Sequence, residues 1–137
     1  MPRRPNHFER EYIVLPPIDH AALTATTTVK GWKVPAGKSF QVTRVTYHNV
    51  TGLAEDPTNV FAGDLKNGAT VIATLFNTDS DGAGTNTLVA DTTVEGVLSA
   101  TAADAWLDAG EQLSLVLTEG GTATLPAGFA IVEGYLY

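Results

Sequence analysis

The sequence predicts an all-β protein with one domain, built as a sandwich or barrel of seven or eight short strands. Its 137 residues suit a single core, since a chain of about 150 residues buries roughly two-thirds of its unfolded surface. Threonine is abundant, whereas lysine and arginine together number only 8. The residues that usually cover helix surfaces are therefore scarce. Turn-forming residues recur at intervals that leave room for strands but for no long helix.

An extended N-terminal arm, residues 1–19, is expected to precede the sandwich domain, residues 20–137. The arm contains four prolines, and proline neither donates to a β-ladder nor fits a helix interior. Its short apolar run, Tyr12, Ile13, Val14 and Leu15, lies between charged residues and a Pro-Pro pair. This pattern suits either an edge strand of the same domain or a segment laid onto another subunit.

Runs of β-branched and aromatic residues between the turn signals predict the remaining strands. These runs are Thr24–Val29, Phe40–Val50, Asn59–Ala62, Thr70–Phe76, Thr92–Leu98, Leu113–Thr118 and Phe129–Tyr137. Strict alternation places every second residue on the same face of a strand. Leu113, Leu115 and Leu117 therefore share one face, and the aromatic residues of the last run share another.

Two stretches depart from this simple alternation. In the second run the apolar phase shifts near Thr43 and Arg44, as if one extra residue entered the strand, which predicts a β-bulge. Residues 100–106 are rich in alanine and fit a single helical turn, but Trp106 and Leu107 fit the start of a strand equally well.

The charge is distributed unevenly along the chain. Residues 1–66 hold all eight basic residues and six acids, whereas residues 67–137 hold nine acids and no base. A nucleic-acid interface needs a basic stripe, so we expect no nucleic-acid partner. No apolar run approaches the roughly 20 residues of a membrane-spanning helix, and the N-terminus does not resemble a secretion signal. We therefore expect a soluble protein that is made inside a cell and has no membrane partner.

No pattern of catalytic or metal-binding residues stands out. The chain has no cysteine, and His7, His20 and His48 are too dispersed for a metal site. The loop with Asp79 and Asp81 resembles the start of a calcium loop, but leucine occupies its twelfth position, so a solvated hairpin loop is the better interpretation. We expect no enzymatic activity, no cofactor, no metal and no small-molecule substrate.

The aromatic residues allow two interpretations. Trp32, Trp106, Tyr135 and Tyr137 could form a platform on which sugar rings stack. Aromatic side chains on strands more often fill cores or subunit interfaces, and the sequence favours this second interpretation.

Three segments carry a resemblance to a known family. They are WKVPAG with FQVTRV (residues 32–37 and 40–45), LDAGEQLSLVL (residues 107–117) and GTATLPAGFAIVE (residues 121–133). Together they resemble the capsid decoration, or cement, proteins of tailed bacteriophages, which are built as jelly-roll-like β-sandwiches. The resemblance implies a homotrimer on the outside of the virion that binds the major capsid protein and carries no catalytic residues.

The arm would then be the capsid anchor. Arg3, Arg4 and Arg10 would pair with carboxylates of the partner, and residues 12–15 would add a strand to an exposed sheet edge. The expected function is a cement protein that binds the exterior of the capsid and stabilises its lattice after synthesis in the host cytoplasm. The alternative is a carbohydrate-binding or receptor-binding β-sandwich module of a virion fibre or of lectin type.

Overall fold

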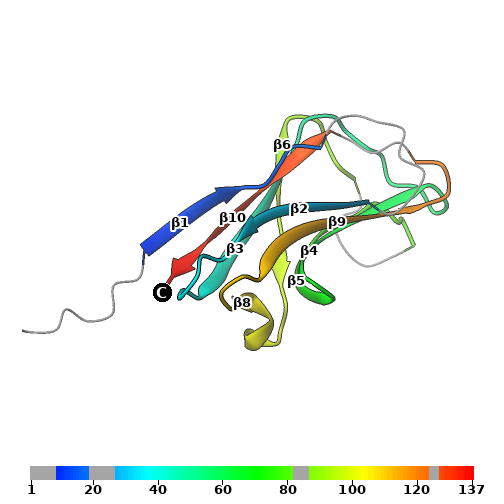
Figure 1. Ribbon diagram of the computed structural model, residues 1–137. Helices are drawn as coiled ribbons and strands as arrows, with labels where there is room; N and C mark the ends of the chain where they lie inside the picture. Colours follow the sequence, from blue (N-terminus) through cyan, green and yellow to red (C-terminus); the bar gives the residue numbers. More distant parts are fainter. Residues whose placement is uncertain (1–8, 19–26, 82–86, 124–126) are drawn as a thin grey trace, which may run out of the picture.

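Two antiparallel sheets lie face to face in the computed structural model of the protein (Figure 1). The structure describes residues 9–18, 27–81, 87–123 and 127–137. The prediction of an all-β sandwich is confirmed, although the described residues form ten strands rather than about eight. The described residues contain no helix that is long and apolar enough to cross a membrane.

The strands divide equally between the two sheets. Sheet 1 has the order β1 (Glu9–Val14), β10 (Gly128–Leu136), β3 (Phe40–Asn49) and β6 (Thr92–Glu95), with β8 (Trp106–Leu107) also paired to β3. Sheet 2 has the order β2 (Thr27–Lys33), β9 (Gln112–Gly120), β4 (Val60–Asn67), β5 (Thr70–Asn77) and β7 (Val97–Leu98). The two-residue strands β7 and β8 are additions to eight longer strands. These eight pass between the sheets in the interleaved order of a jelly roll.

The core lies between the sheets and is built by alternation along the strands. Leu113, Leu115 and Leu117 of β9 are fully buried, as their shared face predicted. From sheet 1, Ala130 and Val132 of β10 point inward and are also fully buried. Leu136 also packs against the core, whereas Phe129, Ile131, Glu133 and Tyr135 of β10, and Tyr137 after it, lie on the outer side. The aromatic residues of the last run therefore belong to the outer face.

The predicted β-bulge is present in β3. Across the pair formed with β10, Arg44 lies opposite Glu133 and Val42 lies opposite Gly134, so Thr43 is the extra residue. The partner position requires a glycine, because a Cβ at Gly134 would clash with the Gln41 carbonyl oxygen. The bulge thus depends on a close backbone approach that a side chain would block.

The expectation of one continuous strand over Thr92–Leu98 is wrong. The segment divides into β6, which pairs with β3 in sheet 1, and β7, which pairs with β5 in sheet 2. Gly96 lies between them, and its N–H donates to the Val45 carbonyl at 2.8 Å. A Cβ at this position would lie 2.8 Å from the Leu75 side chain. The chain therefore changes sheets at a residue with no side chain.

Both interpretations of residues 100–106 apply in succession. Ala102–Ala105 form one turn of 3-10 helix, labelled η1, and Trp106 then begins β8. The other predicted strands are present with shifted ends. Most notably, β2 (Thr27–Lys33) reaches Lys33, and β4 extends to Asn67. The predicted start at Thr24 lies outside the described residues.

Burial of Tyr47 predicts a loss of stability at alkaline pH. Its side chain is fully buried, and its hydroxyl has no hydrogen-bond partner among the described residues. Burial raises the pKa of the phenol to about 12, whereas the pKa in the unfolded chain is about 10. Above pH 10 the unfolded chain releases this proton and the folded chain retains it. The free energy of unfolding should therefore fall by about 2 to 3 kcal/mol between pH 10 and 12.

The variant Tyr47→Phe should lack this contribution to the alkaline loss and should be as stable as the parent at pH 7, or more stable by up to about 1 kcal/mol. Urea unfolding between pH 7 and 12 measures both effects. Tyr137→Phe, at the surface, is the matched control and should keep the full alkaline loss. An identical pH dependence in parent and Tyr47→Phe would contradict the prediction.

Candidate binding surface

The predicted N-terminal anchor segment is the edge strand of its own sheet. Residues 9–14 form β1, which pairs with β10 of the same chain and places Tyr12 opposite Glu133 and Val14 opposite Ile131. Leu15 then donates its N–H to the Ala130 carbonyl at 2.9 Å, and its side chain is buried in the core. The structure therefore shows the first of the two arrangements that the sequence left open. Residues 9–18 pack as part of the sandwich.

The predicted site residues separate onto two faces of β1. Arg10, Tyr12 and Val14 point to the outer face of sheet 1, whereas Ile13 packs against the core and Leu15 lies within it. Arg3 and Arg4 lie outside the described residues. So does the predicted boundary between residues 19 and 20.

The outer face of sheet 1 is rich in aromatic and aliphatic side chains. Cross-strand partners in an antiparallel sheet point to the same side, so the register identifies the residues of this face. We call its apolar members the aromatic face: Tyr12, Val14, Trp106, Phe129, Ile131, Tyr135 and Tyr137. Tyr12 is 59% exposed and Val14 62% exposed. Trp106 and Tyr137 are also exposed, and the remaining members are half-buried.

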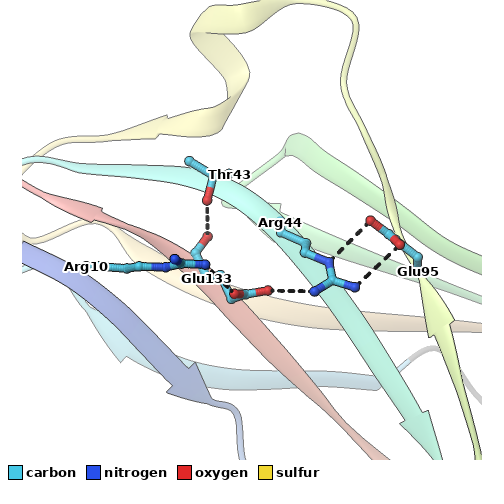
Figure 2. Close-up of polar contacts among 5 residues, drawn as sticks. All are labelled: Arg10, Thr43, Arg44, Glu95 and Glu133. Carbon is cyan, nitrogen blue, oxygen red and sulfur yellow. Dashed lines mark hydrogen bonds and ion pairs between the residues drawn. The ribbon is translucent and has the colours of Figure 1, made fainter.

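A network of charges crosses the aromatic face (Figure 2). Glu133 of β10 accepts from Arg10 of β1 at 3.1 Å and from Arg44 of β3 at 3.3 Å. Arg44 also contacts Glu95 of β6 at 3.3 Å, and this carboxylate is the main reason that the pKa of Arg44 is raised. The Glu133 side chain is only 10% exposed. Two positive and two negative groups thus neutralise one another across four strands.

Aromatic contacts organise the edges of this face. The rings of Trp106 and Tyr137 lie 5.1 Å apart, and the Tyr137 hydroxyl donates to the Gln41 amide oxygen at 3.2 Å. Near the other end of β10, Phe129 packs against His48 at 5.1 Å. Trp32 belongs elsewhere, because its half-buried ring meets Phe40 edge to face. Of the two tryptophans, Trp106 is the more exposed, at 41%.

The outer face of sheet 2 has a different character. The register aligns Thr28 of β2 with Val116 and Asp64, and Lys30 with Ser114 and Lys66. Burial among these neighbours raises the pKa of Asp64. Two valines at the margin of this face are also exposed: Val97 on β7, at 73%, and Val71 on β5, at 36%. The two outer faces of the sandwich therefore differ: one is aromatic and the other consists mainly of hydroxyl and charged groups.

The loop that resembles a calcium site is organised by local turns. Asn77 accepts from the Asp79 N–H at 3.0 Å, and Asp79 accepts from the Asp81 N–H at 3.0 Å. Asp56, which is bridged to Asp79, has its pKa lowered by the N–H groups of Asn59 and Thr58. Among the described residues, no three side chains of the types that bind metals lie close enough to hold an ion. His48 lies on β3, whereas His7 and His20 are outside the described residues.

Sequence reasoning missed the centre of the network. Glu133, Arg44 and Glu95 were not candidates, because Arg10 and Glu133 are separated by 123 positions and their proximity depends on the pairing of β1 with β10. One usable signal was present: Glu133 is the lone acid in the alternating aromatic pattern of the last run.

Comparisons with family models, with curated proteins and with solved structures gave no match to the chain. The interpretation of the surface therefore depends on its own geometry and on the resemblance of the three segments.

Glu133 should contribute more to stability than Glu95, although both contact Arg44. Exposed ion pairs contribute little because water solvates the separated charges, and the Glu95 side chain is 64% exposed. Glu133 is much less exposed and holds two guanidinium groups. We expect Glu133→Gln to lower the free energy of unfolding by about 1 kcal/mol and Glu95→Gln by less than about 0.5 kcal/mol. Urea denaturation at low salt measures both, and equal losses would contradict the assignment of Glu133 as the centre.

Proposed function

We propose that the protein is a non-enzymatic structural component of a bacteriophage virion, a cement protein that binds the major capsid protein on the capsid exterior and stabilises the lattice. The observation that carries the proposal of partner binding is the aromatic face with its internally neutralised charges. The identity of the partner comes from the resemblance of the three segments to decoration proteins. Three copies would assemble together, as that resemblance implies.

The difference between the two outer faces supports an orientation on the capsid. A partner that covers the aromatic face removes apolar surface from water, which contributes about 25 cal/mol per Å². The charges on this face are already paired, so covering them does not isolate any single ion. The hydroxyl-rich and charged face of sheet 2 would remain toward solvent. We therefore assign the capsid contact to sheet 1 rather than to the arm alone.

The mechanism of stabilisation would be multivalent. Each cement copy makes a modest contact, but a copy that bridges adjacent capsid subunits adds its contacts to those that must break before the subunits separate. Many such copies act on one shell, so stability of the particle increases without any chemical step.

The alternative is a carbohydrate-binding module, and one observation favours it. Trp106 and Tyr137 present neighbouring rings beside the Gln41 amide, which supplies both an apolar platform and a hydrogen-bonding group. Quenching or a shift of tryptophan fluorescence on addition of oligosaccharides, lost in Trp106→Phe, would favour this alternative.

The capsid proposal predicts a difference between two exposed valines on opposite faces. Val14→Lys places a charge on the aromatic face, whereas Val97→Lys places the same charge at the margin of the other face. Co-sedimentation with capsids that lack the protein should show at least about tenfold weaker binding for Val14→Lys, since an unpaired charge would be desolvated. Val97→Lys should bind like the parent.

A deletion of residues 2–8 tests Arg3 and Arg4 and leaves β1 in place, whereas a longer deletion would remove Leu15 from the core. If the deletion abolishes binding and Val14→Lys does not, the anchor lies in residues 2–8 rather than on the aromatic face. If the parent protein does not bind capsids, the cement proposal fails.

A further inference from the structure

We propose that the free edge of β1 pairs with β1 of a second copy of this chain, in antiparallel orientation about a twofold axis at Tyr12. The inference concerns contact between copies and does not rest on capsid binding. It starts from the position of β1 at the end of sheet 1, where no strand of the described residues pairs with its outer edge.

The backbone groups at this edge can be assigned. The Leu15 N–H points toward β10, where it donates to Ala130. Neighbouring residues of a strand point their N–H and C=O groups to opposite sides, so those of Arg10, Tyr12 and Val14 point away from β10. The side chains of the same three residues lie on the aromatic face. Partner strands at this edge would therefore meet both free backbone groups and exposed side chains.

This edge is apolar over its second half. Natural edge strands are usually protected by charges, prolines or bulges. Here charges occur at positions 9–11 and prolines at positions 16 and 17, but Tyr12, Ile13 and Val14 carry no such protection. The charge of Arg10 is taken up by Glu133 within the same chain. A second copy can approach without an unpaired cation at the contact.

Only some pairing registers of two β1 strands are free of conflicts between opposite residues. Outward-pointing residues must lie opposite one another for their hydrogen bonds to form. Placing Arg10 opposite Arg10, or Glu11 opposite Glu11, sets like charges together. Sliding the two strands in the opposite direction places Arg10 of one copy opposite Pro16 of the other, and Pro16 has no N–H to donate.

The register with Tyr12 opposite Tyr12 avoids all of these conflicts. It places Arg10 opposite Val14 and Glu11 opposite Ile13, and every outward N–H of the three edge residues meets a carbonyl. Two tyrosines pack across the axis, an aromatic cross-strand pair of the kind that stabilises sheets. The two copies of sheet 1 become one continuous sheet, and their aromatic faces become one continuous surface.

The contact involves one strand from each copy, so its area is small and the association should be weak, with dimers forming at micromolar or higher concentration. If copies also form trimers, a twofold contact of this kind would link neighbouring trimers into a net. The twofold contact would use a surface separate from the contacts that close the trimer ring.

Sedimentation velocity of the full chain over a range of concentrations tests the pairing without any capsid. The parent should show a reversible doubling of mass with concentration, from monomer to dimer or, if three copies assemble as proposed above, from trimer to a pair of trimers. Val14→Pro removes one outward N–H while the pairing of β1 with β10 keeps its own donors, and it should raise the dimer dissociation constant at least about tenfold. Val14→Thr, the matched control, keeps the N–H and should change the constant by less than about threefold. Circular dichroism and thermal melting verify that both variants remain folded.

Cross-linking tests the register itself. Because the chain has no cysteine, Tyr12→Cys introduces a single thiol at the proposed axis, where the distance between opposite Cα atoms, about 5.5 Å, permits a disulfide. Oxidation should yield a covalent dimer, and Trp106→Cys, which lies away from the edge, should yield little. A single species of constant mass at all concentrations, or equal cross-linking of the two variants, would overturn the proposal, and neither result would bear on capsid binding.

Discussion

Strand β10 is the element on which the arrangement of sheet 1 depends, because it lies between β1 and β3 and pairs with both along its length. Its inward residues, Ala130 and Val132, fill the core with the leucines of β9. Its outward residues Phe129, Ile131 and Tyr135 supply three of the seven members of the aromatic face. Glu133 joins Arg10 and Arg44 from the strands on either side. Packing, surface character and charge pairing therefore converge on one strand.

The glycine after Glu133 shows how closely these roles are connected. Gly134 permits the Gln41 carbonyl and the Phe40 ring to approach the strand, and the bulge at Thr43 changes the alignment at this point. Arg44 comes to lie opposite Glu133, and Gln41 comes to lie opposite Tyr135. Without the extra residue, every later side chain of β3 would exchange its inner and outer positions. The charge network is thus a consequence of a backbone irregularity.

Local patterns in the sequence correctly predicted features that depend on neighbouring residues within one strand. Alternation identified Leu113, Leu115 and Leu117 as core residues, and the phase shift near Thr43 identified the bulge. The division at Gly96 was missed, because β6 and β7 follow one another in a single β-branched run, and only the position of the second sheet separates them. The ion pairs of Glu133 were missed for a similar reason. Contact between positions 10 and 133 is a property of strand order, which alternation along one strand does not contain.

The contrast between the two outer faces also separates folding from function. Burial of the inward residues accounts for the sandwich, and a folded sandwich would tolerate polar groups at Tyr12, Val14 or Trp106 as it does at Thr28, Lys30 and Ser114. Exposed apolar side chains do not stabilise an isolated domain, and when they are gathered on one face they mark surfaces that bind partners. The paired charges extend this argument. Charges that already neutralise one another lose less on desolvation than isolated ions do, so this face can be covered at a lower cost in free energy than an equally charged face without pairing.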